Sequence, residues 1–169
     1  MMRFDEARTP HEIMENPESK AETFDLSFPR LAPQETATLN LPKCLLVSSD
    51  AGIRRELADL FRRCDLAPVP VSTLAESRMP LSDRQVCIVL CDECVADGNY
   101  PAILETVQQV DKKIPVIVMS RTGEWPEYLA AIRCGAFDYL AYPPIAGELE
   151  RVIRNAFREL NTRREFAMI

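Results

Sequence analysis

Short apolar runs recur along the chain after residue 40 and alternate with segments whose apolar residues follow a helical period. Within each run the apolar residues occupy successive positions, which is typical of strands buried on both faces of a sheet. One run, Val86–Asp92, ends on a carboxylate. The predicted strands are Lys43–Val47, Pro68–Val71, Val86–Asp92, Ile114–Met119 and Phe137–Ala141.

The segments between the runs predict helices at Ile53–Cys64, Thr73–Ser82, Pro101–Val110, Pro126–Cys134 and Leu149–Leu160. Ser49 or Asp50 is the expected N-cap of the first helix, and Gly135 is the expected end of the fourth. Pro80 interrupts the short second helix, and residues 93–99 are expected to form a loop. Strands that alternate with helices predict an α/β fold, a doubly wound parallel sheet with right-handed crossovers.

Polar residues follow the predicted strands at the point where each strand ends. Because ligands of such sheets bind beyond the carboxyl ends of the strands, these side chains are the candidates for a functional site. They are Ser48, Ser49, Asp50, Asp92, Ser120 and Tyr142.

Two stretches, Ile114–Ser120 and Cys134–Leu140, together with the run that ends at Asp92, resemble the receiver domain of bacterial response regulators, the CheY-like superfamily. The resemblance implies a flavodoxin-like, five-stranded sheet in the order 2-1-3-4-5, and it predicts a receiver domain over residues 41–165. This order places the proline-bearing second strand at an edge, where a missing N–H costs little. In this family a partner histidine kinase transfers a phosphoryl group to the aspartate that matches Asp92.

Three residues match the functional positions of the family. Asp92 matches the phosphoacceptor, Ser120 the hydroxyl that contacts the phosphoryl group, and Tyr139 the aromatic switch residue in the fifth strand. Each also has a simpler interpretation: a carboxylate kept for solubility or capping, a helix cap, and a core aromatic residue.

Other positions depart from the family pattern. Its acidic pair falls on Ser48 and Ser49, and its lysine falls on Tyr142, which is expected to fill the space that the lysine leaves. The resemblance also implies a cis bond between Tyr142 and Pro143. Carboxylates that border Asp92 offer a substitute set of Mg²⁺ ligands, but with so few charges the site is expected to bind Mg²⁺ weakly. That set is Asp50, Asp92 and Glu93.

These departures favour a degenerate receiver, or pseudo-receiver, that acts in two-component (phosphorelay) signalling by protein–protein contact and is not an enzyme. The alternative is a phosphorylatable single-domain receiver that accepts phosphate on Asp92 and at most hydrolyses it slowly. The expected partner is a histidine kinase or a downstream signalling protein.

The last predicted helix carries Arg151, Arg154 and Arg158. Arginines at this spacing form either a solvated face or a contact surface. The resemblance favours contact, since the fourth helix, fifth strand and last helix form the usual docking and dimerisation face of receivers. Only Asn161–Ile169 follows the last predicted helix, so we expect the domain to stand alone and to act through its own surface.

Cysteine chemistry is the alternative of another class, a small redox or metal protein. Cys91 and Cys94 form a CxxC pair, but the pair straddles the end of a strand instead of opening a helix, where a thiol pKa would be lowered. The remaining cysteines are expected in the core: Cys44, Cys64, Cys87 and Cys134. The only histidine, His11, offers no second ligand or catalytic base.

Composition narrows the function classes further. The chain has 169 residues and a net charge of −6, which argues against nucleic-acid binding because that needs a basic face. Residues 1–40 are acidic, contain four prolines and no glycine, and are expected to form a mostly disordered tail. No apolar run is long enough for a membrane span, and the N-terminus lacks an apolar signal core, so the cytoplasm is the expected location.

Overall fold

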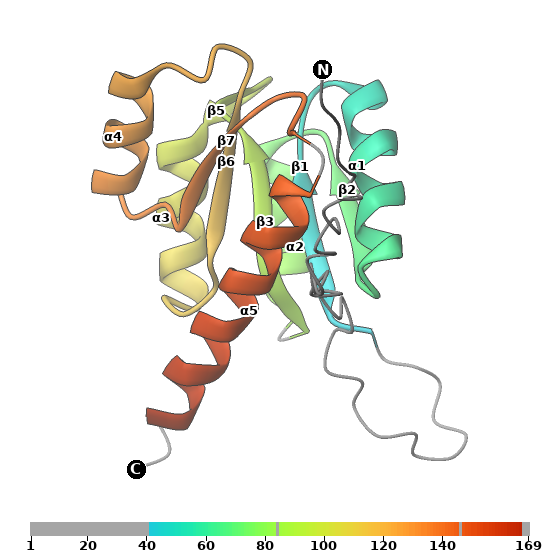
Figure 1. Ribbon diagram of the computed structural model, residues 1–169, viewed down its shortest axis with the longest axis vertical. Coiled ribbons are helices and arrows are strands. Elements are labelled where there is room, and N and C mark those ends of the chain that lie inside the picture. The colour runs from blue at the N-terminus through green and yellow to red at the C-terminus, as the bar shows by residue number, and fades with distance from the viewer. Residues whose placement is uncertain (1–40, 84, 146, 167–169) are drawn as a thin grey trace, which may run out of the picture. The chain divides into compact units, whose positions relative to one another are not determined.

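A computed structural model describes residues 41–166 except 84 and 146, and side chains up to residue 162. The predicted disordered tail, His11 within it, and residues 167–169 lie outside the described residues. Figure 1 shows the described part as a central sheet with helices packed around it.

Five parallel strands form the central sheet in the order β2-β1-β3-β6-β7, which is the predicted 2-1-3-4-5 order once a small hairpin, β4 and β5, is set aside. The strands are β1 (Lys43–Val47), β2 (Ala67–Val71), β3 (Val86–Asp92), β6 (Val116–Ser120) and β7 (Asp138–Ala141). The proline-bearing β2 lies at an edge as predicted, and β3 is buried from Val86 to Cys91. β6 begins at Val116 and not at Ile114, because Ile114 closes a turn onto Asp111 before the ladder starts. β7 begins one residue later than predicted, at Asp138.

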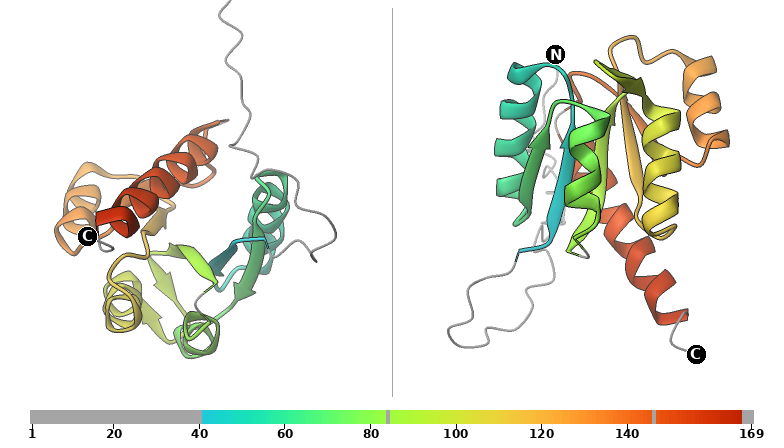
Figure 2. Two further views of the ribbon diagram at one scale, coloured as in Figure 1. Left: turned by 90° about the horizontal axis from the view of Figure 1, so that it is seen from below. Right: turned by 180° about the vertical axis from the view of Figure 1, so that it is seen from behind.

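The helices follow the prediction closely: α1 (Ala51–Arg63), α2 (Leu74–Leu81), α3 (Tyr100–Val110), α4 (Trp125–Arg133) and α5 (Glu148–Phe166). Figure 2 shows α1 and α5 on one face of the sheet and α2 and α3 on the other. Ala131 of α4 packs into the same apolar cluster as Ile103 of α3 and Leu81 of α2. No helix that the structure describes has the length and apolar character needed to cross a membrane.

The segment expected to be a loop after Asp92 instead contains a short antiparallel hairpin, β4 (Cys94–Val95) and β5 (Gly98–Asn99). Asp97 accepts hydrogen bonds from the backbone N–H groups of Leu74 and Ala75 at 2.6 and 2.9 Å, so its carboxylate caps α2. Asn99 caps α3 through the N–H of Ala102. The hairpin therefore fixes both neighbouring helices relative to the end of β3.

Most cysteines lie in the core as predicted, but Cys134 is exposed. It is the C-cap of α4, and Gly135 follows it with φ = 100°. A left-handed residue at this position turns the chain out of the helix, which is why glycine occurs here. The prediction for Cys134 was wrong because the turn carries its side chain off the buried face.

Candidate functional site

Asp92 lies at the carboxyl end of the central strand β3, partly buried. The hydroxyl of Ser48, at the end of neighbouring β1, donates a hydrogen bond of 2.5 Å to its Oδ2. Burial raises the pKa of Asp92, and the bond from Ser48 lowers it to a smaller extent. Ser48 is itself fully buried, so one of the two positions at which the resemblance leads us to expect an acidic residue supports Asp92 as a hydrogen-bond donor.

Asp50 is the N-cap of α1, as predicted. Its Oδ1 accepts the backbone N–H groups of Gly52 and Ile53 at 2.8 and 3.1 Å. These two bonds are the main cause of its lowered pKa. The other oxygen, Oδ2, faces the guanidinium of Arg121 at 3.3 Å.

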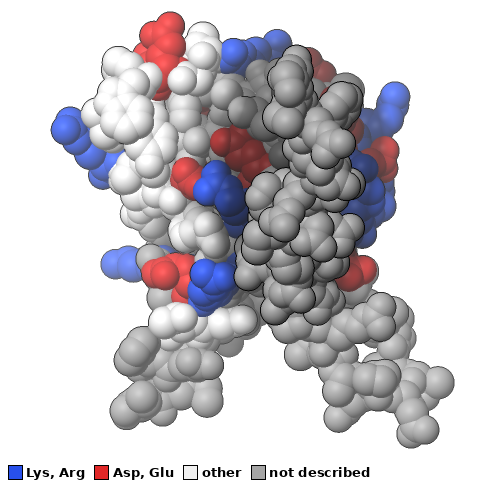
Figure 3. All heavy atoms as spheres, in the orientation of Figure 1, with Lys and Arg blue, Asp and Glu red and all other residues white. Residues whose placement is uncertain are grey.

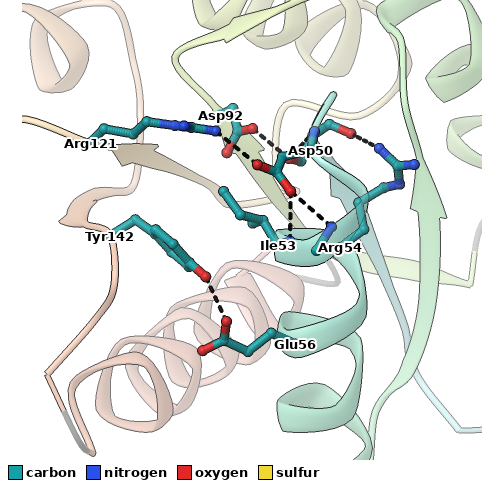
Figure 4. Close-up of polar contacts among 9 residues, drawn as sticks. Asp50, Ile53, Arg54, Glu56, Asp92, Arg121 and Tyr142 are labelled. Atoms are coloured by element: carbon teal, nitrogen blue, oxygen red, sulfur yellow. Dashed lines mark hydrogen bonds and ion pairs between the residues drawn. The ribbon is translucent and has the colours of Figure 1, made fainter.

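Arg121 and Arg54 bring positive charge to the site. Arg121 follows Ser120 at the end of β6 and extends towards Asp50 and Asp92, whose pKa values it lowers (Figure 4). Arg54 donates from Nη1 to the carbonyl oxygen of Ser48 at 2.5 Å and has a smaller lowering effect on the pKa of Asp92. Sequence reasoning assigned no role to either arginine.

The two remaining serines have their hydroxyls occupied. Ser49 donates to the carbonyl of Ser72 at 3.3 Å and accepts the N–H of Ala96 at 2.9 Å. Ser120, which is buried, accepts the N–H groups of Thr122 and Gly123, both at 3.1 Å. These bonds hold the turn that leads to α4, but they do not cap that helix, whose N-cap is Glu124. The simpler interpretation of Ser120 as a helix cap was therefore wrong.

Tyr139 points inward and is 7% exposed. Its hydroxyl donates a hydrogen bond of 2.6 Å to Oε1 of Glu93, the residue after Asp92. Burial first, and then the bond to Glu93, raise the pKa of Tyr139 to about 12. The carboxylate of Glu93 is thus directed at the phenol of β7.

Tyr142 does not cover Asp92 as the sequence suggested. Its hydroxyl donates to Oε2 of Glu56 on α1 at 2.6 Å, and this bond is the largest cause of a pKa raised to about 12. Figure 4 shows the ring directed towards α1. The bond from Tyr142 to Pro143 is cis, which confirms the expectation from the resemblance.

The donor set around Asp92 does not fit Mg²⁺. This ion prefers several free oxygens in near-octahedral geometry, whereas Asp50 is held by amides and Arg121, and Glu93 by Tyr139. Among the described residues no group of three or more His, Cys, Asp or Glu side chains gathers to hold a metal. The predicted set of Asp50, Asp92 and Glu93 stays a prediction that the geometry does not favour.

The CxxC pair is poorly arranged for thiol chemistry. Cys91 is fully buried while Cys94 is exposed, and both are free thiols. Burial raises the pKa of Cys91 strongly, and the reactive thiolate is disfavoured there. Cys91 therefore cannot act as the partner thiol of Cys94, and the pair does not support the cysteine-based alternative.

Comparisons with known proteins were made with this geometry in view. No protein-family model matches the chain. The chain is 27% identical over 127 residues to the response regulator protein PilR of Pseudomonas aeruginosa, covering 75% of the chain and 28% of PilR. It is 29% identical over 114 residues to the KDP operon transcriptional regulatory protein KdpE of Escherichia coli, covering 68% of the chain and 50% of KdpE. The chain thus spans half or less of the length of these two relatives.

Among solved structures, the beryllofluoride-activated NtrC4 receiver domain dimer aligns with a TM-score of 0.66 at 21% identity, over 71% of this chain and 99% of that one. The fold is that of receiver domains, and the curated response regulators that match most of the chain support a CheY-like receiver domain.

Proposed function

We propose that this chain acts in two-component signalling as a pseudo-receiver, which signals by protein contact without phosphorylation of Asp92. The proposal rests on the identity and the hydrogen bonds of the groups around Asp92. Ser48 and Ser49 replace the expected carboxylates, and the hydroxyl of Ser48 is used to hold Asp92. Tyr142, at the expected lysine position, is bound to Glu56. Phosphoryl transfer needs a cation that neutralises the developing charge, and this site offers no ligand set for one.

A chain of contacts links the end of β3 to the molecular surface and supports a contact role. Glu93 binds Tyr139, whose ring meets the ring of Tyr128 edge-on at 6.2 Å. Tyr128 in turn stacks on Trp125 at 5.1 Å, and Trp125 is 68% exposed. Figure 3 shows a largely uncharged surface over α4. Exposed aromatic residues in such positions are typical contact residues at protein interfaces.

The proposed partner is a histidine kinase or a downstream signalling protein that docks on the face formed by α4, β7 and α5. A second copy of the chain is the other candidate for this face. Arg151 and Arg158 are exposed on α5 and provide its charged side. In sedimentation equilibrium, a dimer that Trp125→Ala weakens would assign the face to self-association, and a monomer would leave it to another protein.

The decisive experiment is the intact mass after incubation with acetyl phosphate and Mg²⁺, beside an Asp92→Asn control. We expect no adduct on either protein. One added phosphoryl group on the wild type that is absent from Asp92→Asn would refute the pseudo-receiver and establish the alternative, a receiver phosphorylated on Asp92.

A further inference from the structure

A guanidinium lies beside the carboxylates of the candidate site. Arg121 Nη2 is 3.3 Å from Oδ2 of Asp50, and Figure 4 shows the side chain extending from the end of β6 towards Asp50 and Asp92. The strands β3 and β6 are adjacent, with Asp92 paired to Met119, so Arg121 begins two residues beyond the partner of Asp92. Arg121 therefore lies near Asp92 because their strands are neighbours in the sheet.

This position allows one cation to act on two carboxylates. Arg121 lowers the pKa of Asp50 and also that of Asp92. Like charges repel, so this guanidinium disfavours a divalent cation beside the same carboxylates. The side chain of Arg121 is 69% exposed, so water and salt screen much of this repulsion. A site with few carboxylates binds a divalent cation weakly, so even a screened repulsion acts against the ion.

We propose that Arg121 is the resident cation of the Asp92 site, which neutralises Asp50 and Asp92 and excludes a divalent metal ion. The inference rests on the proposed function and deepens it: the site lacks ligands for Mg²⁺, and it also contains the charge that Mg²⁺ would supply. The state of the site is then independent of the concentration of Mg²⁺.

Binding of the metal ion alone tests this proposal. Mg²⁺ is titrated by calorimetry, and Mn²⁺ by electron paramagnetic resonance of the free ion, with the wild type, Arg121→Gln and Arg133→Gln. Arg133 is an exposed arginine at the end of α4 and serves as the matched control. The wild type and Arg133→Gln are expected to show no saturation up to about 20 mM, above the range of weak protein cation sites. Arg121→Gln is expected to bind at least about tenfold more tightly, a change of about 1.4 kcal/mol.

Further variants locate the gained site and separate charge from bulk. Arg121→Lys keeps the positive charge and should still exclude the ion. Adding Asp92→Asn to Arg121→Gln should abolish the gained binding. Since Arg121 is exposed, these changes leave the core intact, and far-ultraviolet circular dichroism checks this.

Two results would overturn the inference: saturable binding by the wild type that matches Arg121→Gln, or no gain in Arg121→Gln. Failure of the proposed function looks different. If acetyl phosphate modifies Asp92 equally well in EDTA, the pseudo-receiver is refuted while Arg121 as the resident cation stands. If modification requires Mg²⁺, both are refuted.

Discussion

The hydrogen bond between Tyr139 and Glu93 is the contact that joins the strand-end site to the aromatic residues of α4. Replacing Tyr139 by Phe removes the hydroxyl that donates to Glu93 Oε1 at 2.6 Å and leaves the ring in place. No cavity forms, because the ring keeps its packing against Tyr128. The variant therefore measures the hydrogen bond and little else.

The size of the effect follows from the exposure of the acceptor. A hydrogen bond to a charged group contributes about 1.5–3 kcal/mol when both partners are buried. Glu93 is only partly buried, so its carboxylate recovers water once the phenol is gone. We expect Tyr139→Phe to lower the free energy of unfolding by about 1–1.5 kcal/mol. For a domain of this size that corresponds to a fall in Tm of about 3–5 °C.

A double-mutant cycle isolates the contact. Urea unfolding is followed by far-ultraviolet circular dichroism for Tyr139→Phe, Glu93→Ala and the double variant, and we expect a coupling energy of about 1 kcal/mol. Tyr128→Phe is the matched control, because the described part of the chain offers its hydroxyl no hydrogen bond. A coupling below about 0.3 kcal/mol, within the usual error of additivity, would refute the reasoning. So would a control that costs as much as Tyr139→Phe.

Three further predictions follow from the titratable groups. Burial raises the pKa of Asp92, so the ionised carboxylate lowers the stability of the fold as pH rises above the ordinary carboxyl range. Asp92→Asn should therefore raise Tm at neutral pH. This gain should vanish at acid pH, where Asp92 is protonated. Tyr139 and Tyr142 have pKa values raised to about 12, so their contribution to stability is complete below the ordinary tyrosine pKa and is lost as pH rises towards 12. Phenolate absorbance should show that both titrate above the ordinary tyrosine pKa. Tyr142→Phe should reduce the loss of Tm at alkaline pH. Cys94 and Cys134 are the exposed thiols, so a thiol reagent should modify these two quickly in the native protein and the buried four only in denaturant; fast modification of a buried thiol would contradict the described packing.

The sheet could be predicted from the sequence because its signals are local. Runs such as Val86–Asp92 are apolar at successive positions, and the prolines of β2 restrict that strand to an edge. Parallel strands then bring their carboxyl ends to one edge, so the proximity of Ser48 to Asp92 could also be predicted. The hairpin after Asp92 could not, because strands of two residues carry no periodic pattern.

The hydrogen-bond and ion-pair partners of the site residues were the part that sequence could not provide. Arg121 stands in a polar loop without apolar periodicity, and only the pairing of β3 with β6 shows that it lies beside Asp92. Tyr142 could equally have covered the site or turned away, and the position of Glu56 on α1 decides between these. A long side chain can reach groups on several elements, and its position in the sequence does not show which of them it will contact. The sequence offered one signal for this contact, the arginine that directly follows Ser120.

The residues at this site that differ from the family pattern are easier to explain together than singly. A serine at position 48 alone would remove a metal ligand and leave Asp92 partly buried without its counter-ion. Here the hydroxyl of Ser48 donates to that carboxylate, and Arg121 supplies the charge. Conversely, Arg121 next to an intact acidic pair would compete with the metal ion for the same oxygens. Restoring a carboxylate at position 48 would therefore add a negative charge beside Asp92 and remove its hydrogen-bond donor, while Arg121 still held Asp50. In the proposed site, the serine at position 48 and Arg121 thus belong to one electrostatic arrangement, which balances the charge of Asp92 without a metal ion.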